Sequence, residues 1–239
     1  MAREARATPR SSSTPRPGAA GRLPRGTLTE EMILTAALRL LDEQGLDAFS
    51  LPRLGQELGA SSTAVYRHFA SRDEIVLGVA DLLIGESLDG FEPDESWQQT
   101  LHDLALRIWD TYQRHPAAAS ISFMRTTRRP HEMRAVDAIL GAVLAAGWTG
   151  TEALVQYRGF ASFVLSVAGA GAHFESLPEG ERAGDLAAWP QVYGRLDTAS
   201  HRHILALAPH FGAEIAHREI YERQVDLYLG AMAAQAPLS

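Results

Sequence analysis

Four residues near the first quarter of the chain carry groups that could form hydrogen bonds with another molecule. They are two small hydroxyls, a phenol and a guanidinium, at Ser62, Thr63, Tyr66 and Arg67. On a short helix this spacing leaves them on the outward side, near the end where free amides carry partial positive charge. Donors of this kind suit phosphate oxygens and the base edges of the DNA major groove. The pattern therefore indicates a nucleic-acid contact.

Two consecutive helices are needed to present this face. Ser50 is a candidate cap for the first helix, Pro52 falls in its first turn, and Gly59 supplies the left-handed residue that ends it. Ser61 can cap a second helix, which we expect to run from Ser62 to about Phe69. The spacing of these caps predicts a short first helix, a tight turn and a short second helix.

The apolar residues of the two helices can pack against each other. Each helix has one apolar face, formed by Leu51, Leu54 and Leu58 in the first and by Val65 and Phe69 in the second. Gly55 allows a close crossing, because a larger side chain there would hold the helices apart. The stretch predicts a helix-turn-helix motif, and the alternative is a tight helical corner of any all-α protein.

Helices on both sides of the motif would complete its core. A helix starting near Thr29 and ending at Gly45 carries apolar residues at offsets of 0, 3, 4, 7 and 8, namely Ile33, Ala36, Ala37, Leu40 and Leu41. After the motif, the run Ser-Arg-Asp-Glu at residues 71–74 is a capping box that opens a long helix. These elements give a three-helix unit that leads into the rest of the chain.

Three runs of residues resemble the N-terminal domain of the tetracycline-repressor (TetR) family. They are Leu-Leu-Asp-Glu-Gln-Gly at 40–45, Ala-Val-Tyr-Arg-His-Phe at 64–69 and Ser-Arg-Asp-Glu at 71–74. The resemblance covers roughly Thr27 to Leu83. It implies a homodimeric, all-helical, cytoplasmic transcription factor. Such a factor is usually a repressor that leaves its double-stranded DNA operator when a small molecule binds the C-terminal domain.

The same resemblance assigns DNA-contacting residues. In the second helix of the motif, Ser62, Thr63, Tyr66 and Arg67 would face bases or phosphates, and His68 would lie beside a phosphate. The starts of the two preceding helices would add contacts from three further residues, Thr29, Ser50 and Arg53. Pro52 departs from many members of the family, which can carry a polar or basic side chain there, so one contact is in doubt.

Composition and charge agree with a nucleic-acid contact at the front of the chain. The 239 residues carry a net charge of −7, but residues 1–72 carry +3 and the remainder −10. Much of the basic excess lies in residues 1–26, a Pro-, Ser- and Ala-rich segment with six arginines, which we expect to be disordered when free. It could contact phosphates or the minor groove, or have no specific role.

Metal, thiol and membrane chemistry find little support. The chain has no cysteine, and the pairs His201–His203 and His210–His217 lack the spacing and the carboxylate that a zinc site needs. We therefore expect neither a metal nor a cofactor. The longest nearly uncharged stretch, Gly159 to Ala172, is shorter than the roughly 18 to 20 residues of a spanning helix.

The C-terminal part is expected to be a larger helical domain for ligand binding and dimerisation. We divide the chain into residues 1–26, a helix-turn-helix domain at 27–72 and a regulatory domain at 73–239. Helices near 151–174 and 211–234 would form the homodimer as a four-helix bundle. Residues 175–199 are expected to form a long loop with at most short helices, because of their prolines and glycines.

A ligand pocket could lie between the helices of the regulatory domain. Its candidate lining consists of Trp97, Leu101, His102, Arg107, Trp109, Phe123, Met133, Tyr157, Phe160 and Phe163, with His102, Arg107 or Tyr157 as polar groups. The alternative is that these side chains fill a core, as most aromatic residues at helical spacing do.

Two other classes of function compete with an inducible regulator. An enzyme with a DNA-binding domain is not supported, because the sequence shows no phosphate-binding Gly-rich loop, no nucleophile elbow and no suitably spaced acid pair. A DNA-organising protein or a regulator that works without an inducer stays open as the alternative.

Overall fold

The computed structural model describes residues 28–197, 199–213 and 216–237, so the Arg-rich segment 1–26 lies outside the described residues. The described chain is helical and contains no β-strand, which confirms the all-α prediction. The α-helices are α1 (Glu30–Ala48), α2 (Leu51–Glu57), α3 (Ser62–Val65), α4 (Arg72–Ser87), α5 (Trp97–Arg114), α6 (Pro116–Ser122), α7 (Pro130–Ala145), α8 (Gly150–Ser176), α9 (Glu179–Gln191), α10 (Arg202–Leu207) and α11 (His217–Gln235). Two short 3-10 helices flank α10, at Tyr193–Arg195 and Ala208–His210.

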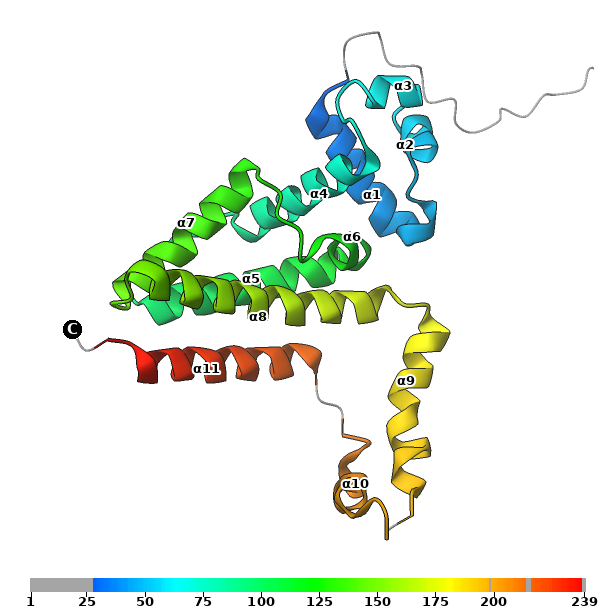
Figure 1. Ribbon diagram of the computed structural model, residues 1–239. Helices are drawn as coiled ribbons and strands as arrows, with labels where there is room; N and C mark the ends of the chain where they lie inside the picture. Colours follow the sequence, from blue (N-terminus) through cyan, green and yellow to red (C-terminus); the bar gives the residue numbers. More distant parts are fainter. Residues whose placement is uncertain (1–27, 198, 214–215, 238–239) are drawn as a thin grey trace, which may run out of the picture.

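The first three helices form a compact unit, the head (α1–α3), at one end of the molecule (Figure 1). Each of the first four helices begins at a hydroxyl that accepts a backbone N–H of its first turn: Thr29 from Met32, Ser50 from Arg53, Ser61 from Ala64 and Ser71 from Glu74, at 3.2 to 3.4 Å. Gly45 has φ of 73° and breaks α1, as its position predicts. The start points of these helices are therefore encoded locally.

The long helix α4 joins the head to the remaining helices. It packs against α1 of the head and against α5, α6 and α7. Ile75, Val79 and Leu83 are each at most 1% exposed. They belong to one hydrophobic core that continues from the head into the body (α5–α8 and α11). A displacement of α4 would therefore change the packing of both the head and the body.

The body is built around α8, which packs against α5, α6, α7 and α11. One face of α8 is fully covered, with Phe160, Val164, Ala168 and Ala172 at most 1% exposed. α11 lies alongside α8 in Figure 1 and contributes the buried ring of Tyr221, whose hydroxyl donates to the carbonyl of Ala105 in α5 at 3.0 Å. Burial raises the pKa of this phenol, so it stays a hydrogen-bond donor.

The prediction of a long loop at 175–199 is wrong, because the structure places α9 there. Glu179 and Glu181 lie in its first turn, where acidic side chains favour a helix start, and Pro190 lies so close to the end that it costs little. The last helix also starts later than expected, at His217. Phe211 belongs to the preceding turn, and its ring lies 5.4 Å from that of Trp189 in α9.

The segment from α9 to Ala208–His210 projects from the body (Figure 1). Its helices pack mainly against one another, and α9 and α10 contain no buried residue. Several large apolar side chains are consequently at least 39% exposed, namely Leu186, Trp189, Val192, Tyr193 and Leu207. Such a cluster is typical of a surface that is covered in an assembly.

Candidate nucleic-acid interface and ligand cavity

Two buried side chains, on the inner side of α3 and of the turn after it, hold this segment against the rest of the head. Val65 is fully buried and Phe69, in the turn that follows, is 1% exposed. Gly55 of α2 makes the close approach possible: a Cβ there would lie 2.9 Å from the carbonyl oxygen of Ala60 and 3.3 Å from the amide nitrogen of Ser62. The turn between α2 and α3 is therefore pressed directly onto the backbone of α2.

The outward side of α3 and of the turn after it is polar and open to solvent. Tyr66 is 51% exposed, Thr63 and Arg67 are exposed, and Ser62 and His68 are half-buried. The phenol of Tyr66 and the guanidinium of Arg67 together offer oriented hydrogen-bond donors and a flat aromatic ring. This face can enter a groove without rearranging the core of the head.

The other predicted contact residues lie at the starts of α1 and α2. The hydroxyl oxygens of Thr29 and Ser50 accept the capping N–H groups, which leaves their protons free to donate to a phosphate. The guanidinium of Arg53 donates to the side-chain oxygens of Gln44 and Gln56, so it is already oriented on the surface of the head. All three residues are exposed.

A cavity lies in the body between α4, α5, α7 and α8. Its free volume is about 80 Å³, enough for a few water molecules. The lining is mostly apolar and consists of Ala80, Ile84, Ser87, Ile108, Tyr112, Ser122, Phe123, Arg125, Glu132, Ala135, Val136, Ile139, Tyr157, Phe160, Ala161, Val164 and Leu165. A few polar groups among apolar walls are typical of a small-molecule site.

Three of the predicted pocket residues, Phe123, Tyr157 and Phe160, line this cavity. The others do not. The side of α5 that carries Leu101, His102 and Trp109 is turned towards α11 or the core. His102 lies 3.4 Å from Asp226, and Trp109 stacks on Tyr221 with ring centres 4.6 Å apart.

The remaining predicted pocket residues are occupied elsewhere. Phe163 stacks on Tyr228 of α11 at 4.8 Å, and Trp97 is half-buried against the core. Arg107 binds Asp103 and the carbonyl of Asp89, and Met133 is 60% exposed. Helical periodicity identifies the apolar face of a helix but not the neighbouring helix that this face meets. The sequence alone therefore could not separate these residues from the true cavity lining.

Two charged cavity residues, Arg125 and Glu132, were missed. Arg125 forms a double hydrogen bond with Asp73 in the first turn of α4, at 2.8 Å for both contacts, and this bonding lowers the pKa of Asp73. The carboxylate of Glu132 accepts the N–H of Arg128 at 2.6 Å. The sequence gives one signal for Arg125, the polar stretch 125–129 between apolar helices. Such a stretch indicates a loop and does not by itself indicate a cavity wall.

Among the described residues, no group of three or more His, Cys, Asp or Glu side chains could hold a metal ion. In the same part of the chain, no single helix is long and apolar enough to cross a membrane. Only α8 taken together with residues 179–195, across a bend of 113°, meets the criteria of length and composition.

A helix-turn-helix head with an exposed polar face, joined by one helix to a larger helical body with an apolar cavity, defines a DNA-binding transcriptional regulator. Residues 33–79 match the family of bacterial regulatory proteins, tetR family. Residues 90–210, about half of the chain, match the tetracyclin repressor-like C-terminal domain. The chain belongs to the TetR family of transcriptional regulators, as its resemblance predicts, and it is not an enzyme.

Curated relatives agree with this assignment. The chain is 25% identical over 138 residues to an HTH-type transcriptional regulator of Saccharopolyspora erythraea, an alignment that covers 58% of each chain. It is 26% identical over 141 residues to the HTH-type transcriptional repressor DrrR1 of Streptomyces coeruleorubidus, covering 57% of this chain and 52% of that one. The chain thus spans just over half the length of these relatives.

Solved structures share the fold over most of the chain. The Streptomyces coelicolor TetR family protein ActR, in a crystal structure described as a complex with actinorhodin, aligns with a TM-score of 0.75 at 22% identity. The alignment covers 88% of this chain and 98% of that one. A second transcriptional regulator from the same organism aligns with a TM-score of 0.72 at 24% identity, over 88% and 99% of the two chains.

Proposed function

We propose that the chain is a repressor that binds a pseudo-palindromic DNA operator as a homodimer and is released by a small molecule. The observation that carries the DNA contact is the solvent-exposed face of α3 and its following turn, with Tyr66 half exposed between Thr63 and Arg67. The repressor assignment is supported by the relative DrrR1, an HTH-type transcriptional repressor. The contacts would come from Thr29, Ser50, Arg53, Ser62, Thr63, Tyr66, Arg67 and His68.

The proposed dimer interface is the exposed apolar face of α8 and α11. On α8, Leu154 and Val155 are 50% and 53% exposed, and on α11 Ile220 and Leu227 are 41% and 74% exposed. Two copies of this helix pair would bury these side chains in a four-helix bundle. A two-fold axis through the bundle would present two α3 helices to half-sites about 34 to 36 Å apart on the duplex.

The function is tested by selecting duplexes from a random pool with the full-length protein and measuring the stoichiometry of the complex. We expect a palindromic preferred sequence bound by two chains. Equal affinity for all duplexes at the same salt concentration would instead favour a DNA-organising protein.

Leu227→Arg should shift the protein to monomers, because it places a charge in the centre of the proposed interface without touching the core. Each monomer would retain one recognition face only, so affinity for the selected duplex should fall by roughly a hundredfold or more. Sedimentation velocity and duplex titration measure both effects. Leu144→Arg is the matched control, since Leu144 is 55% exposed on α7. A dimeric Leu227→Arg variant would rule out this interface.

The proposed effector site is the cavity lined by Phe123, Tyr157 and Phe160. A drug-sized ligand needs several hundred cubic ångströms, so binding must widen the present space of about 80 Å³. Most of the lining is apolar or aromatic, which favours a hydrophobic, ring-containing effector. The complex of ActR with actinorhodin supports such a role for a related fold.

A screen of hydrophobic aromatic compounds tests the effector. A true effector should stabilise the protein by about 2.7 kcal/mol at a hundred times its Kd and should release the selected duplex. Ala161→Phe, which fills the cavity, should abolish both effects and leave duplex binding intact; Gly141→Phe on the open side of α7 is the control.

The small free volume of the cavity favours one alternative, a regulator that works without an inducer. Selective duplex binding that no compound releases, and an Ala161→Phe variant that behaves like the parent protein, would support that alternative.

A further inference from the structure

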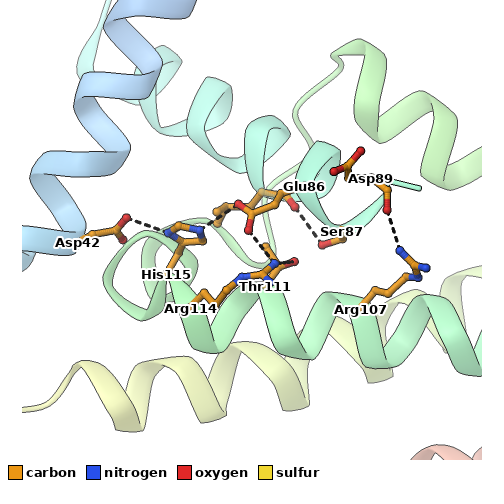
Figure 2. A network of polar contacts seen from close by, with 9 residues as sticks. Asp42, Glu86, Ser87, Asp89, Arg107, Thr111, Arg114 and His115 are labelled. Atoms are coloured by element: carbon orange, nitrogen blue, oxygen red, sulfur yellow. Dashed lines mark hydrogen bonds and ion pairs between the residues drawn. The ribbon is translucent and has the colours of Figure 1, made fainter. Parts of the chain in front are cut away.

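The sharp corner between α5 and α6 is formed by a single residue, His115, whose ring is bonded on both sides. Nδ1 lies 2.8 Å from a carboxylate oxygen of Asp42 in α1, and Nε2 lies 2.9 Å from a carboxylate oxygen of Glu86 in the last turn of α4 (Figure 2). The side chain of His115 is only 17% exposed. One imidazole therefore connects the head, α4 and the body.

The two carboxylates determine which form of the imidazole fits. A neutral ring has one N–H and can donate to one carboxylate only, whereas the imidazolium donates to both. The other oxygen of Glu86 is bound by Arg114 of α5 at 2.7 Å, which fixes the orientation of this carboxylate. The charged groups that face the ring are thus Asp42 from α1 and Glu86 from α4, with Arg114 from α5 behind Glu86.

The position of the corner makes this contact relevant to signalling. α6 starts directly after His115, packs against α1, α4 and α8, and ends at Ser122 and Phe123 on the cavity. A ligand that widens the cavity would push on the C-terminal end of α6. His115 lies directly before the N-terminal end of the same helix. The contact is therefore placed between the proposed effector site and the head.

We propose that His115 is the positioning residue that holds the head against the body, by bonding as an imidazolium to Asp42 and Glu86 at once. The inference rests on the proposed function, in which the ligand-free arrangement binds the operator. We call these two bonds the clamp. With the clamp closed, the two heads of a dimer keep one orientation. With the clamp open, the heads adopt many orientations, and only a fraction of these orientations fits both half-sites.

The clamp depends on pH in a defined direction. The hydrogen bond and charge of Asp42, together with Glu86, raise the pKa of His115 above its usual value of 6.5, and partial burial opposes this. A group with a raised pKa stabilises the closed state at pH values below 6.5 and loses this contribution as the pH rises through the raised pKa. Selective operator binding should consequently weaken towards alkaline pH.

The experiment measures affinity for the selected duplex between pH 5.5 and 9 at constant ionic strength, for the full-length protein and for His115→Gln. We expect the parent protein to lose roughly threefold to tenfold in affinity across this range, since only part of the free energy of the lost charge-assisted hydrogen bond affects operator binding. His115→Gln should bind at the alkaline level throughout. Glutamine keeps a polar side chain but carries no titratable proton.

Two further variants separate the clamp from other causes. His68, the histidine at the proposed DNA face, is retained in His115→Gln, so the difference between the two profiles reports His115 alone. His173→Gln changes an exposed histidine of α8 and should keep the parent profile. Asp42→Asn should flatten the profile in part and covers the case in which His115→Gln folds poorly.

Identical pH profiles for the parent protein, His115→Gln and Asp42→Asn would overturn the proposal, while selective binding itself would still stand. Absence of any selective duplex at every pH would instead remove the proposed function. A loss of thermal stability in His115→Gln with an unchanged pH profile would assign the residue a structural role only and would also overturn the proposal.

Discussion

Replacing Tyr66 and Arg67 together by alanine is expected to abolish the preference for the selected duplex, with a loss in affinity of roughly a hundredfold or more. A well-placed base contact contributes about 1 to 3 kcal/mol of discrimination, and both side chains lie on the exposed face of α3 and its turn. Residual binding from phosphate contacts should remain and should depend strongly on salt.

The same double variant should unfold at nearly the parental temperature. Neither side chain belongs to the core of the head, and exposed substitutions usually change stability by less than about 0.5 kcal/mol. Duplex titration and a thermal melt measure the two quantities. Arg134→Ala, an exposed arginine on α7, is the control for loss of charge. A large fall in Tm would mean that this face supports the fold and does not face DNA.

Gly55→Ala should damage both the stability of the head and its binding to DNA. The new Cβ would lie 2.9 Å from the carbonyl oxygen of Ala60 and 3.3 Å from the amide nitrogen of Ser62, and backbone atoms cannot rotate away. Overpacking of this kind costs about 1 to 3 kcal/mol, against a gain of about 0.5 to 1 kcal/mol from replacing glycine within a helix. The turn must move, and Ser62 at the start of α3 moves with it.

A thermal melt and duplex titration check this prediction. We expect Tm to fall by roughly 2 to 6 °C and selective binding by about tenfold or more. Gly141→Ala on α7 is the matched control: no atom lies within 4 Å of its added Cβ, so it should stabilise the protein slightly and leave DNA binding unchanged. Equal stability of the two variants would show that α2 and α3 do not need this close contact.

The starts of the helices in the head were predictable because their determinants are local, but the end of α3 was not: it ends at Val65 and not near Phe69. The hydroxyl caps at Ser50, Ser61 and Ser71 and the glycine at position 45 act within three or four residues of chain, and the structure places each as expected. The resemblance to the TetR family rests on the same stretch and is confirmed by the family matches. The contact roles of the exposed residues stay predictions.

The body was predictable as a set of helices but not as a packed arrangement. The sequence shows the apolar face of α5, but the structure alone decides that Trp109 meets Tyr221 of α11 while Ile108 and Tyr112 meet the cavity. α9 was missed because its glycines and prolines indicate a loop when they are counted without regard to their position in the helix.

The sequence by itself determines where the first four helices begin and which residues after Ser61 face outward, because caps and the spacing of apolar residues act between neighbouring residues. It also carries the resemblance that identifies the family. Only the tertiary structure decides which helix faces enclose the cavity and brings Asp42 and Glu86 to the two sides of His115, across 73 and 29 residues of chain. Such distant groups meet through the packing of whole helices. No local pattern of residues encodes that packing.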